Sequence, residues 1–116
     1  MHFTNFLAIA GLSDSSSQTS AAIDARQLFS CSLVASFSDS AVGGTVKLQA
    51  SNDPASGGGF VPSIWVDVPL GSATVTAGAS VIVTIASSNY RWLRVVFSPT
   101  TAGAGLVTVA FNALGT

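Results

Sequence analysis

Asn52, Asp53 and Asp67 come closer than any other residues in this sequence to the pattern of a ligand site. Asn52 and Asp53 belong to the stretch QASNDP, and Asp67 follows in WVD. Carboxylate and carbonyl oxygens are the ligands that Ca²⁺ prefers, so Asp53 and Asp67 could hold this cation. They are not part of a run of spaced ligands, however, and Asn and Asp before Pro54 are also typical turn residues. The sequence favours the turn, and we expect no metal and no cofactor.

Catalytic side chains are scarce. His2 is the only histidine, there is no Glu, and the Asp residues are scattered singly. A Ser-His-Asp arrangement would require His2 to be anchored among distant strands. The stretches GGTVK and GGG lack the Lys-Ser/Thr ending of a phosphate-binding loop. Cys31 lies in an alternating apolar run, where a buried side chain is more typical than a nucleophile. We therefore expect a protein that is not an enzyme.

A second group of candidate residues is aromatic and basic. In IWVDV and YRWLRVVF, the tryptophans fall opposite to aliphatic residues. Each tryptophan is exposed or covered by a partner if the aliphatic residues point into the core, and belongs to the core if the facing is inverted. An arginine near an aromatic ring can stack on it, a pairing enriched in interface hot spots. The predicted contact positions are Trp65, Trp92, Arg94, Asn52, Asp53 and Phe60. Stacking of a glycan on a tryptophan is the alternative.

The elements that position these residues are β-strands, because apolar residues recur with a period of two and no window shows helical periodicity. The expected strands cover residues 2–9, 27–37, 45–51, 64–68, 72–76, 79–85, 91–97 and 105–112. Seven or eight short strands at this spacing predict an all-β fold, a two-sheet antiparallel β-sandwich that forms a single domain over residues 1–116. We favour a jelly roll, and the pattern alone does not separate it from an immunoglobulin-like order.

Several strands carry more detailed expectations. The strand at 27–37 should turn Phe29, Cys31, Leu33, Ala35 and Phe37 inward. The last strand, at 105–112, ends almost at the C-terminus, so we place it at a sheet edge where it could pair with another chain. Residues 1–20 form either a strand or an arm that reaches a neighbour. A secretion signal fits less well, because no Lys or Arg precedes the apolar part.

The composition bears on the surface of the protein. Charged residues make up 8% of the 116 residues, against about 25% in an average soluble domain. A surface with this little charge repels neighbouring molecules only weakly. We therefore expect much of the surface to be covered by other subunits. A net charge of -1 with four Lys and Arg argues against binding of nucleic acid. No run of 18 apolar residues occurs, so we expect no membrane-spanning helix.

Four stretches carry a resemblance to known proteins: VKLQASNDP, WVDVP, ATVTAGASVIVTI and YRWLRVVFSPTTAGAGLVTVAFNALG. Together, over roughly residues 45–115, they resemble small bacteriophage structural proteins with Q-x-S-N-D, W-x-D-I/V and Y-R motifs before a Gly/Thr-rich turn and a last strand. The resemblance implies a virion component, either a capsid, spike, decoration or tail subunit. Such a subunit works by binding copies of itself and other virion proteins.

A weaker similarity leads to discoidin-like and carbohydrate-binding sandwiches. It rests on the SND stretch, on Trp65 and on RWLR, while Pro54 replaces the glycine of their pattern. This similarity implies the alternative function, a carbohydrate- or receptor-binding module.

Overall fold

The computed structural model describes residues 2–54, 61–86 and 89–115, with side chains from Thr4 onwards. Its strands are β1 (His2–Ser13), β2 (Gln18–Thr19), β3 (Ile23–Asp24), β4 (Leu28–Phe37), β5 (Gly43–Ser51), β6 (Val66–Val75), β7 (Val81–Ile85), β8 (Trp92–Thr101) and β9 (Leu106–Gly115). The predicted all-β fold is confirmed. The two-residue strands β2 and β3 fall between the expected strands. The described ranges contain no helix long and apolar enough to cross a membrane.

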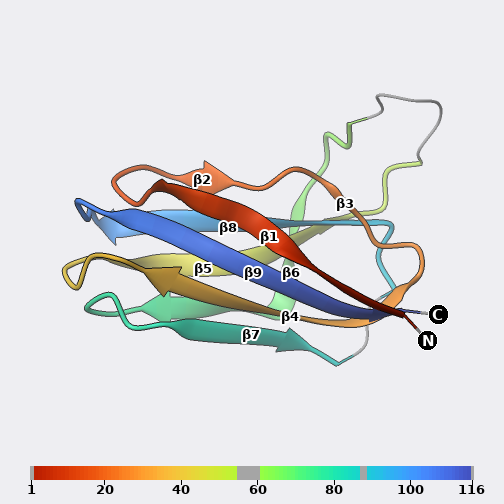
Figure 1. Cartoon of the computed structure of the whole chain (residues 1–116). Coiled ribbons are helices and arrows are strands. Elements are labelled where there is room, and N and C mark those ends of the chain that lie inside the picture. Colours follow the sequence, from red (N-terminus) through yellow and green to blue (C-terminus); the bar gives the residue numbers. More distant parts are fainter. Residues whose placement is uncertain (1, 55–60, 87–88, 116) are drawn as a thin grey trace.

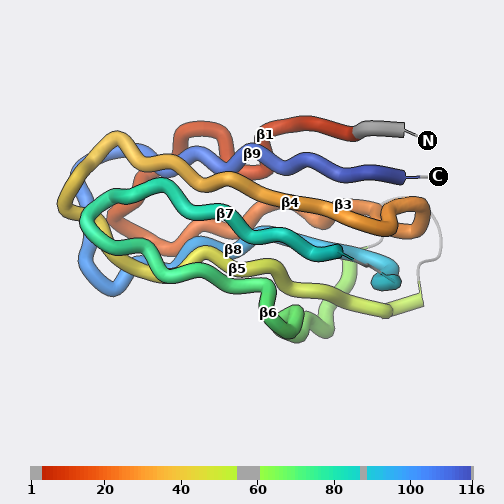
Figure 2. The backbone as a smooth tube through the Cα atoms, turned by 90° about the horizontal axis from the view of Figure 1, so that it is seen from below, coloured from red at the N-terminus to blue at the C-terminus, as the bar shows by residue number. Residues whose placement is uncertain are grey.

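The strands form two antiparallel sheets that face each other (Figures 1 and 2). One sheet has the order β1-β9-β4-β7, and the other has the order β2-β8-β5-β6, with β3 also paired to β8. The pairing is nested, because β1 meets β9, β2 and β3 meet β8, β4 meets β7, and β5 meets β6. The chain is thus a long hairpin rolled into two layers. This is the strand order of a jelly roll, so the predicted sandwich is confirmed and the immunoglobulin-like order is excluded.

The core lies between the sheets, because the long strands send alternate side chains inward. The largest fully buried side chains include Phe97, Phe111, Ile9, Leu33, Leu48 and Leu93. In β8, burial alternates, so that Leu93 and Val95 point inward and Trp92 and Arg94 occupy the outer face. The periodicity of β8 therefore places Trp92 and Arg94, two of the predicted contact residues, on the outer face of the second sheet, β2-β8-β5-β6.

Strand β6 corrects the expectation of two separate strands at 64–68 and 72–76. It runs from Val66 to Val75 as one edge strand with a wide bulge, since Gln49 pairs with Asp67 but Lys47 pairs with Ser72. Within the bulge, Pro69 cannot donate to the ladder, and Leu70 has a φ of 61°. Gly71 follows, where a Cβ would lie 3.0 Å from the Val68 carbonyl oxygen. The bulge leaves the Leu70 side chain 96% exposed.

In strand β4, some of the side chains that were predicted to point inward do so. Cys31, Leu33 and Ala35 are buried, and half-buried Phe37 lies 5.4 Å from Phe97 between ring centroids. Phe29 is 40% exposed, so its predicted inward position is wrong. The pairing of β4 with β9 shifts between Leu28 and Ser30, and this irregularity interrupts the simple alternation.

Strand β9 corrects the prediction of a terminal edge strand. It lies between β1 and β4, because β1 pairs with it from His2 opposite Gly115 to Ser13 opposite Leu106. The N-terminal segment therefore takes the edge of this sheet within the same chain. Both termini lie at the same end of the sandwich (Figure 1).

Candidate functional site

Trp65 and Arg94 are in contact on the outer face of the second sheet. The Arg94 guanidinium carbon lies 4.4 Å from the centroid of the Trp65 ring. The Trp65 indole N–H donates to the Pro62 carbonyl at 3.1 Å, which holds the ring against its own chain. Ile64 and Val66 on either side of Trp65 are 66% and 64% exposed, so the regular alternation expected for 64–68 is wrong. Trp65 is half-buried, is not part of the core cluster, and has Arg94 stacked on its ring.

Arg94 begins a row of polar contacts across three strands. Its Nε donates to Gln49 Oε1 at 2.8 Å, and Gln49 Nε2 donates to Asp67 Oδ1 at 2.9 Å. Lys47 Nζ lies 3.1 Å from Asp67 Oδ1. The row forms because Arg94 and Asp67 are the register partners of Gln49 on its two sides. The hydrogen bond from Gln49, followed by that from Lys47, lowers the pKa of Asp67.

Trp92 has a different arginine as its partner. The Arg91 guanidinium carbon lies 4.0 Å from the Trp92 ring centroid, and Arg91 Nη1 donates to Asp24 Oδ1 at 2.9 Å. Asp24 also accepts from Arg26 at 2.8 Å. The hydrogen bond from the Arg26 side chain is the largest cause that lowers the pKa of Asp24. Both tryptophans therefore stack on arginines of β8 or of the segment just before it, and the predicted stacking is present in the structure.

Asn52 and Asp53 hold the ends of the loop between β5 and β6. Asn52 Oδ1 accepts the backbone N–H of Arg91 at 3.0 Å. Asp53 Oδ2 accepts the backbone N–H groups of Ser63 at 2.8 Å and Ile64 at 3.1 Å. These N–H groups, Ser63 first, lower the pKa of Asp53. The two side chains act on the backbone, in keeping with the turn interpretation.

The structure does not gather the residues of the calcium alternative into a ligand set. The Asp53 carboxylate accepts hydrogen bonds from backbone N–H groups. The Asp67 carboxylate accepts from Gln49 and pairs with Lys47. In the part of the chain that the structure describes, no three His, Cys, Asp or Glu side chains lie together as a metal site would need. Phe60, the remaining predicted contact residue, lies outside the described residues. Buried Cys31 has its pKa raised to about 11 by desolvation, which makes it a poor nucleophile.

A pocket of about 480 Å³ lies between the turn after β5 and the edge strand β6. Its lining includes Asn52, Asp53, Val66 and Pro69, with Tyr90 as its aromatic residue. An aromatic ring beside polar groups is the composition that ligand pockets favour. Two of the predicted contact residues, Asn52 and Asp53, line this pocket, and Tyr90 was not among the predicted residues.

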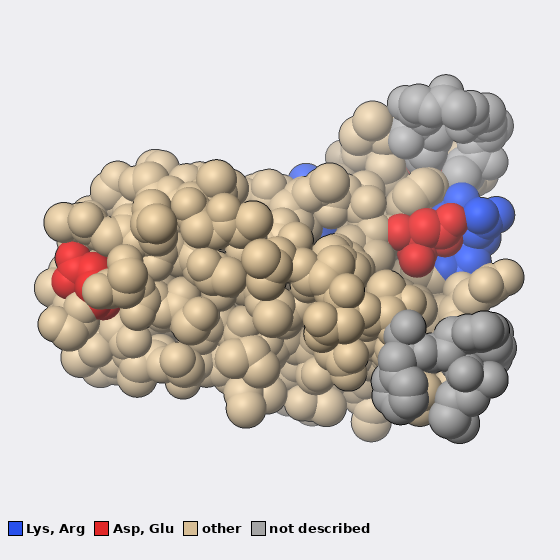
Figure 3. All heavy atoms as spheres, viewed as in Figure 1, with Lys and Arg blue, Asp and Glu red and all other residues tan. Residues whose placement is uncertain are grey.

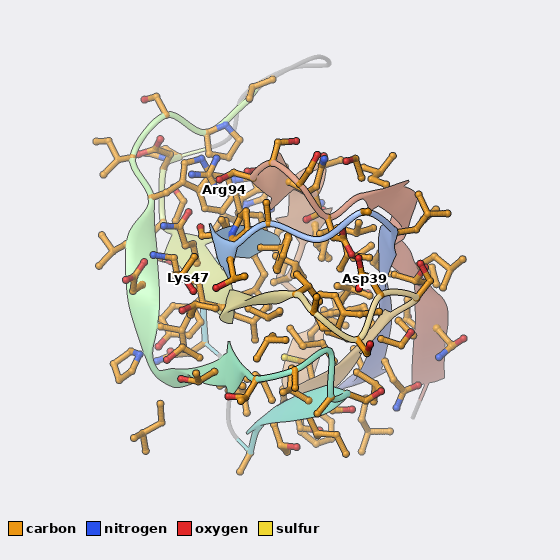
Figure 4. All side chains as sticks on the ribbon, turned by 90° about the vertical axis from the view of Figure 1, so that its left-hand side faces the viewer. Asp39, Lys47 and Arg94 are labelled. Atoms are coloured by element: carbon orange, nitrogen blue, oxygen red, sulfur yellow. The ribbon has the colours of Figure 1, made fainter. Side chains whose placement is uncertain are left out.

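The outer face of the first sheet was missed by the sequence analysis. Ile82, Leu7 and Val34 are 66%, 56% and 41% exposed there. The signal was present in the sequence, because β1, β4, β7 and β9 contain no Asp, Glu, Lys or Arg. Figure 3 shows this side of the molecule, where most of the visible charged atoms lie at the two ends and only small areas of blue show near the upper middle. Figure 4 shows Lys47 and Arg94 together on the second sheet, apart from Asp39.

Strand order and core define a jelly-roll sandwich, and several solved structures are similar to it in fold. A scan against protein-family models found no match, and neither did a search of curated protein sequences. Among solved structures, the PBSX exported protein XepA is similar with a TM-score of 0.73 and 11% identity, over 97% of this chain and 37% of XepA. The SPBc2 prophage-derived protein YomS has a TM-score of 0.58 and 13% identity, over 97% and 92% of the two chains. PirA has a TM-score of 0.58 and 12% identity, over 96% and 94%.

These identities show a shared fold. The chain spans 37% of the length of XepA and nearly all of YomS. The fold of this protein therefore also occurs in the SPBc2 prophage-derived protein YomS, which has almost the same length, as the resemblance to small bacteriophage proteins predicted.

Proposed function

We propose that this protein is a non-enzymatic structural subunit of a bacteriophage particle, which binds copies of itself and other virion proteins. The observation that carries the proposal is the number of large apolar side chains left on the surface of a chain with so little charge. Leu70 is 96% exposed, Val61 is 75% exposed, and Ile64 and Ile82 are each 66% exposed. Where such side chains form a contiguous patch, they mark contact sites for other proteins.

Two further features support the proposal. The jelly-roll fold is shared with phage-derived proteins, one of which has almost the same length as this chain. The charges that are present are largely used within the chain, since Asp24, Asp67, Lys47 and Arg91 form ion pairs with one another or with Arg26. Assembly would then be driven by burial of apolar area, worth roughly 25 cal/mol per Å².

The mass of the purified protein in solution tests self-association. Light scattering at a low and a high concentration should give a defined oligomer, and a chelator should not change it. A clean monomer at high concentration would overturn self-assembly. An oligomer that dissociates in chelator would show that a cation holds the contacts, against this account.

The proposal includes that this protein has no enzymatic activity. A hydrolase of this sequence would depend on His2, which begins β1. We expect no hydrolytic activity from the purified protein, and activity that is lost on His2→Ala would contradict the proposal.

A carbohydrate- or receptor-binding module is the second candidate, and the pocket beside Tyr90 is the observation that favours it. Glycan arrays with the wild type, Trp65→Ala, Trp92→Ala and Tyr90→Ala discriminate between the candidates. The structural proposal predicts no glycan signal that depends on these side chains. Binding by a monomer that is lost in Tyr90→Ala or in either tryptophan variant would favour the module.

A further inference from the structure

We propose that the outer face of the sheet β1-β9-β4-β7 binds the same face of a second copy of this chain. The inference rests on the proposed function and deepens it, because it names the surface through which copies associate. Three properties of this face carry it: an apolar row, a row of uncharged hydrogen-bonding groups beside it, and the absence of charge.

The apolar row crosses all four strands. Leu7 of β1 pairs with Ala110 of β9, Ala110 pairs with Val34 of β4, and Val34 pairs with Ile82 of β7. Side chains opposite each other in such a ladder lie about 5 Å apart on the same face, so the four form one continuous stripe. Leu7, Val34 and Ile82 are 56%, 41% and 66% exposed. The stripe is thus available to another molecule along its full width.

The adjacent row consists of small polar side chains. Asn5 pairs with Asn112, Asn112 with Ser32, and Ser32 with Thr84. Asn, Ser and Thr side chains each carry both a donor and an acceptor. Identical rows from two copies can therefore hydrogen-bond to each other, whereas two rows of Asp or of Lys could not. A two-fold contact requires this self-complementarity, because the same surface is used by both subunits.

Charge distinguishes this face from the other side of the sandwich. No Asp, Glu, Lys or Arg occurs in β1, β4, β7 or β9, and in Figure 3 most of the visible charged atoms lie at the two ends of this side. Pairing through it therefore buries no charge and brings no like charges together. The outer face of the other sheet carries Lys47, Asp67 and Arg94. Pairing through that face would desolvate these groups.

The size of the face fits a contact between copies in an assembly. Strands rise about 3.3 Å per residue and lie about 4.8 Å apart, so three strands of about ten residues and a shorter β7 cover roughly 550 Å². Two copies would bury about 1,100 Å² in total, at the lower end of specific interfaces. Such a contact is weak for an isolated pair, so the purified protein should associate through it at high concentration, and it becomes more stable where other contacts in a particle hold the copies together.

Ile82→Lys tests the inference, with Val66→Lys as the matched control. The two positions are 66% and 64% exposed, on strands of different sheets, so neither lysine should disturb the core. Sedimentation equilibrium gives the dissociation constant of each variant, and thermal unfolding verifies that each is folded. We expect Ile82→Lys to weaken self-association at least tenfold and Val66→Lys to leave it within twofold of the wild type, because only the first lysine would be buried in the contact.

The outcomes separate this inference from the proposed function. Self-association that survives Ile82→Lys but is lost in Val66→Lys would overturn the inference and place the contact at the edge strand β6, while the structural role would stand. A wild type that stays monomeric would overturn self-assembly itself. Salt gives a second readout, since an uncharged interface should keep its dissociation constant as the salt concentration rises. A steep loss of affinity with salt would contradict pairing through this face.

Discussion

Arg94 stacks on Trp65 and holds the segment before β6 against the outer face of its own sheet. The guanidinium carbon is 4.4 Å from the ring centroid, and the Nε–H of the same arginine donates to Gln49. Arg94 therefore connects an aromatic side chain in the connection before the edge strand to the hydrogen-bonded row across β8, β5 and β6.

This contact should be measurable as a coupling energy. A double-mutant cycle with Trp65→Leu and Arg94→Met, followed by urea unfolding, should give about 0.5–1 kcal/mol of coupling, as expected for an exposed cation–π pair. The control cycle combines Trp65→Leu with Arg26→Met, because Arg26 pairs with Asp24 instead. Coupling near zero in the first cycle, or equal coupling in both, would mean that the Trp65–Arg94 contact does not stabilise the fold.

Leu70 combines a left-handed backbone conformation with an almost fully exposed side chain. Replacement of Leu70 by glycine should therefore not lower the free energy of unfolding. Its φ is 61°, which costs an L-residue about 1–2 kcal/mol, and glycine accepts this conformation. Leu70→Gly should therefore leave the free energy of unfolding unchanged or raise it by up to about 1 kcal/mol.

Val66→Gly provides the comparison for Leu70→Gly. Val66 is also exposed in β6 and is not among the residues with positive φ. Loss of a side chain in an ordinary strand conformation should lower the free energy of unfolding by roughly 0.5–1 kcal/mol. Equal losses in the two variants would show that the Leu70 backbone is not strained.

Cys31 should make the stability depend on alkaline pH. Burial raises the pKa of the thiol from 9.0 to about 11 in the folded protein. The unfolded chain thus loses its proton first, so this contribution to stability is complete below pH 9 and is lost as the pH rises toward 11. Urea unfolding between these limits should show a smaller decline in Cys31→Ala than in the wild type. Identical slopes would contradict the raised pKa.

Asp39 should contribute to stability at neutral pH and lose that contribution in acid. Its carboxylate accepts the backbone N–H groups of Ala104 and Ala41, and these hydrogen bonds lower its pKa, Ala104 having the larger effect. Because the folded pKa lies below the unfolded one, the contribution is present above about pH 4 and declines as the pH falls. Asp39→Asn should reduce this decline in chemical unfolding experiments, and an unchanged acid profile would rule out the contribution.

The sequence patterns predicted the sheets and the inward faces better than they predicted the neighbours of each strand. Alternation located Leu33 in β4 and Val95 in β8, because a period of two depends on local geometry alone. The pattern missed the exposure of Phe29 and the bulge at Leu70, because both arise from the register with a paired strand. It also misplaced β9 at an edge, since nothing in the residues of β9 records that β1 pairs beside it.

In the candidate site, too, the local sequence predicted the kind of contact but not which residues form it. The chemistry of arginine and tryptophan predicted the stacking, but the pairing of Arg94 with Trp65 and of Arg91 with Trp92 depends on where the 61–65 segment folds. The uncharged face of β1-β9-β4-β7 could have been found from the sequence, because its signal is the absence of charge in four strands. Recognition of that face required the knowledge that these four strands form one sheet.

The protein content of purified phage particles tests the structural role most directly. Quantitative mass spectrometry of particles from the culture that produces this chain should find it as a repeated component, in many copies per particle. The protein should remain with the particles through density-gradient purification. If the chain is absent from the particles and is recovered only as a free monomer, it is not a virion subunit, and the binding module becomes the better account.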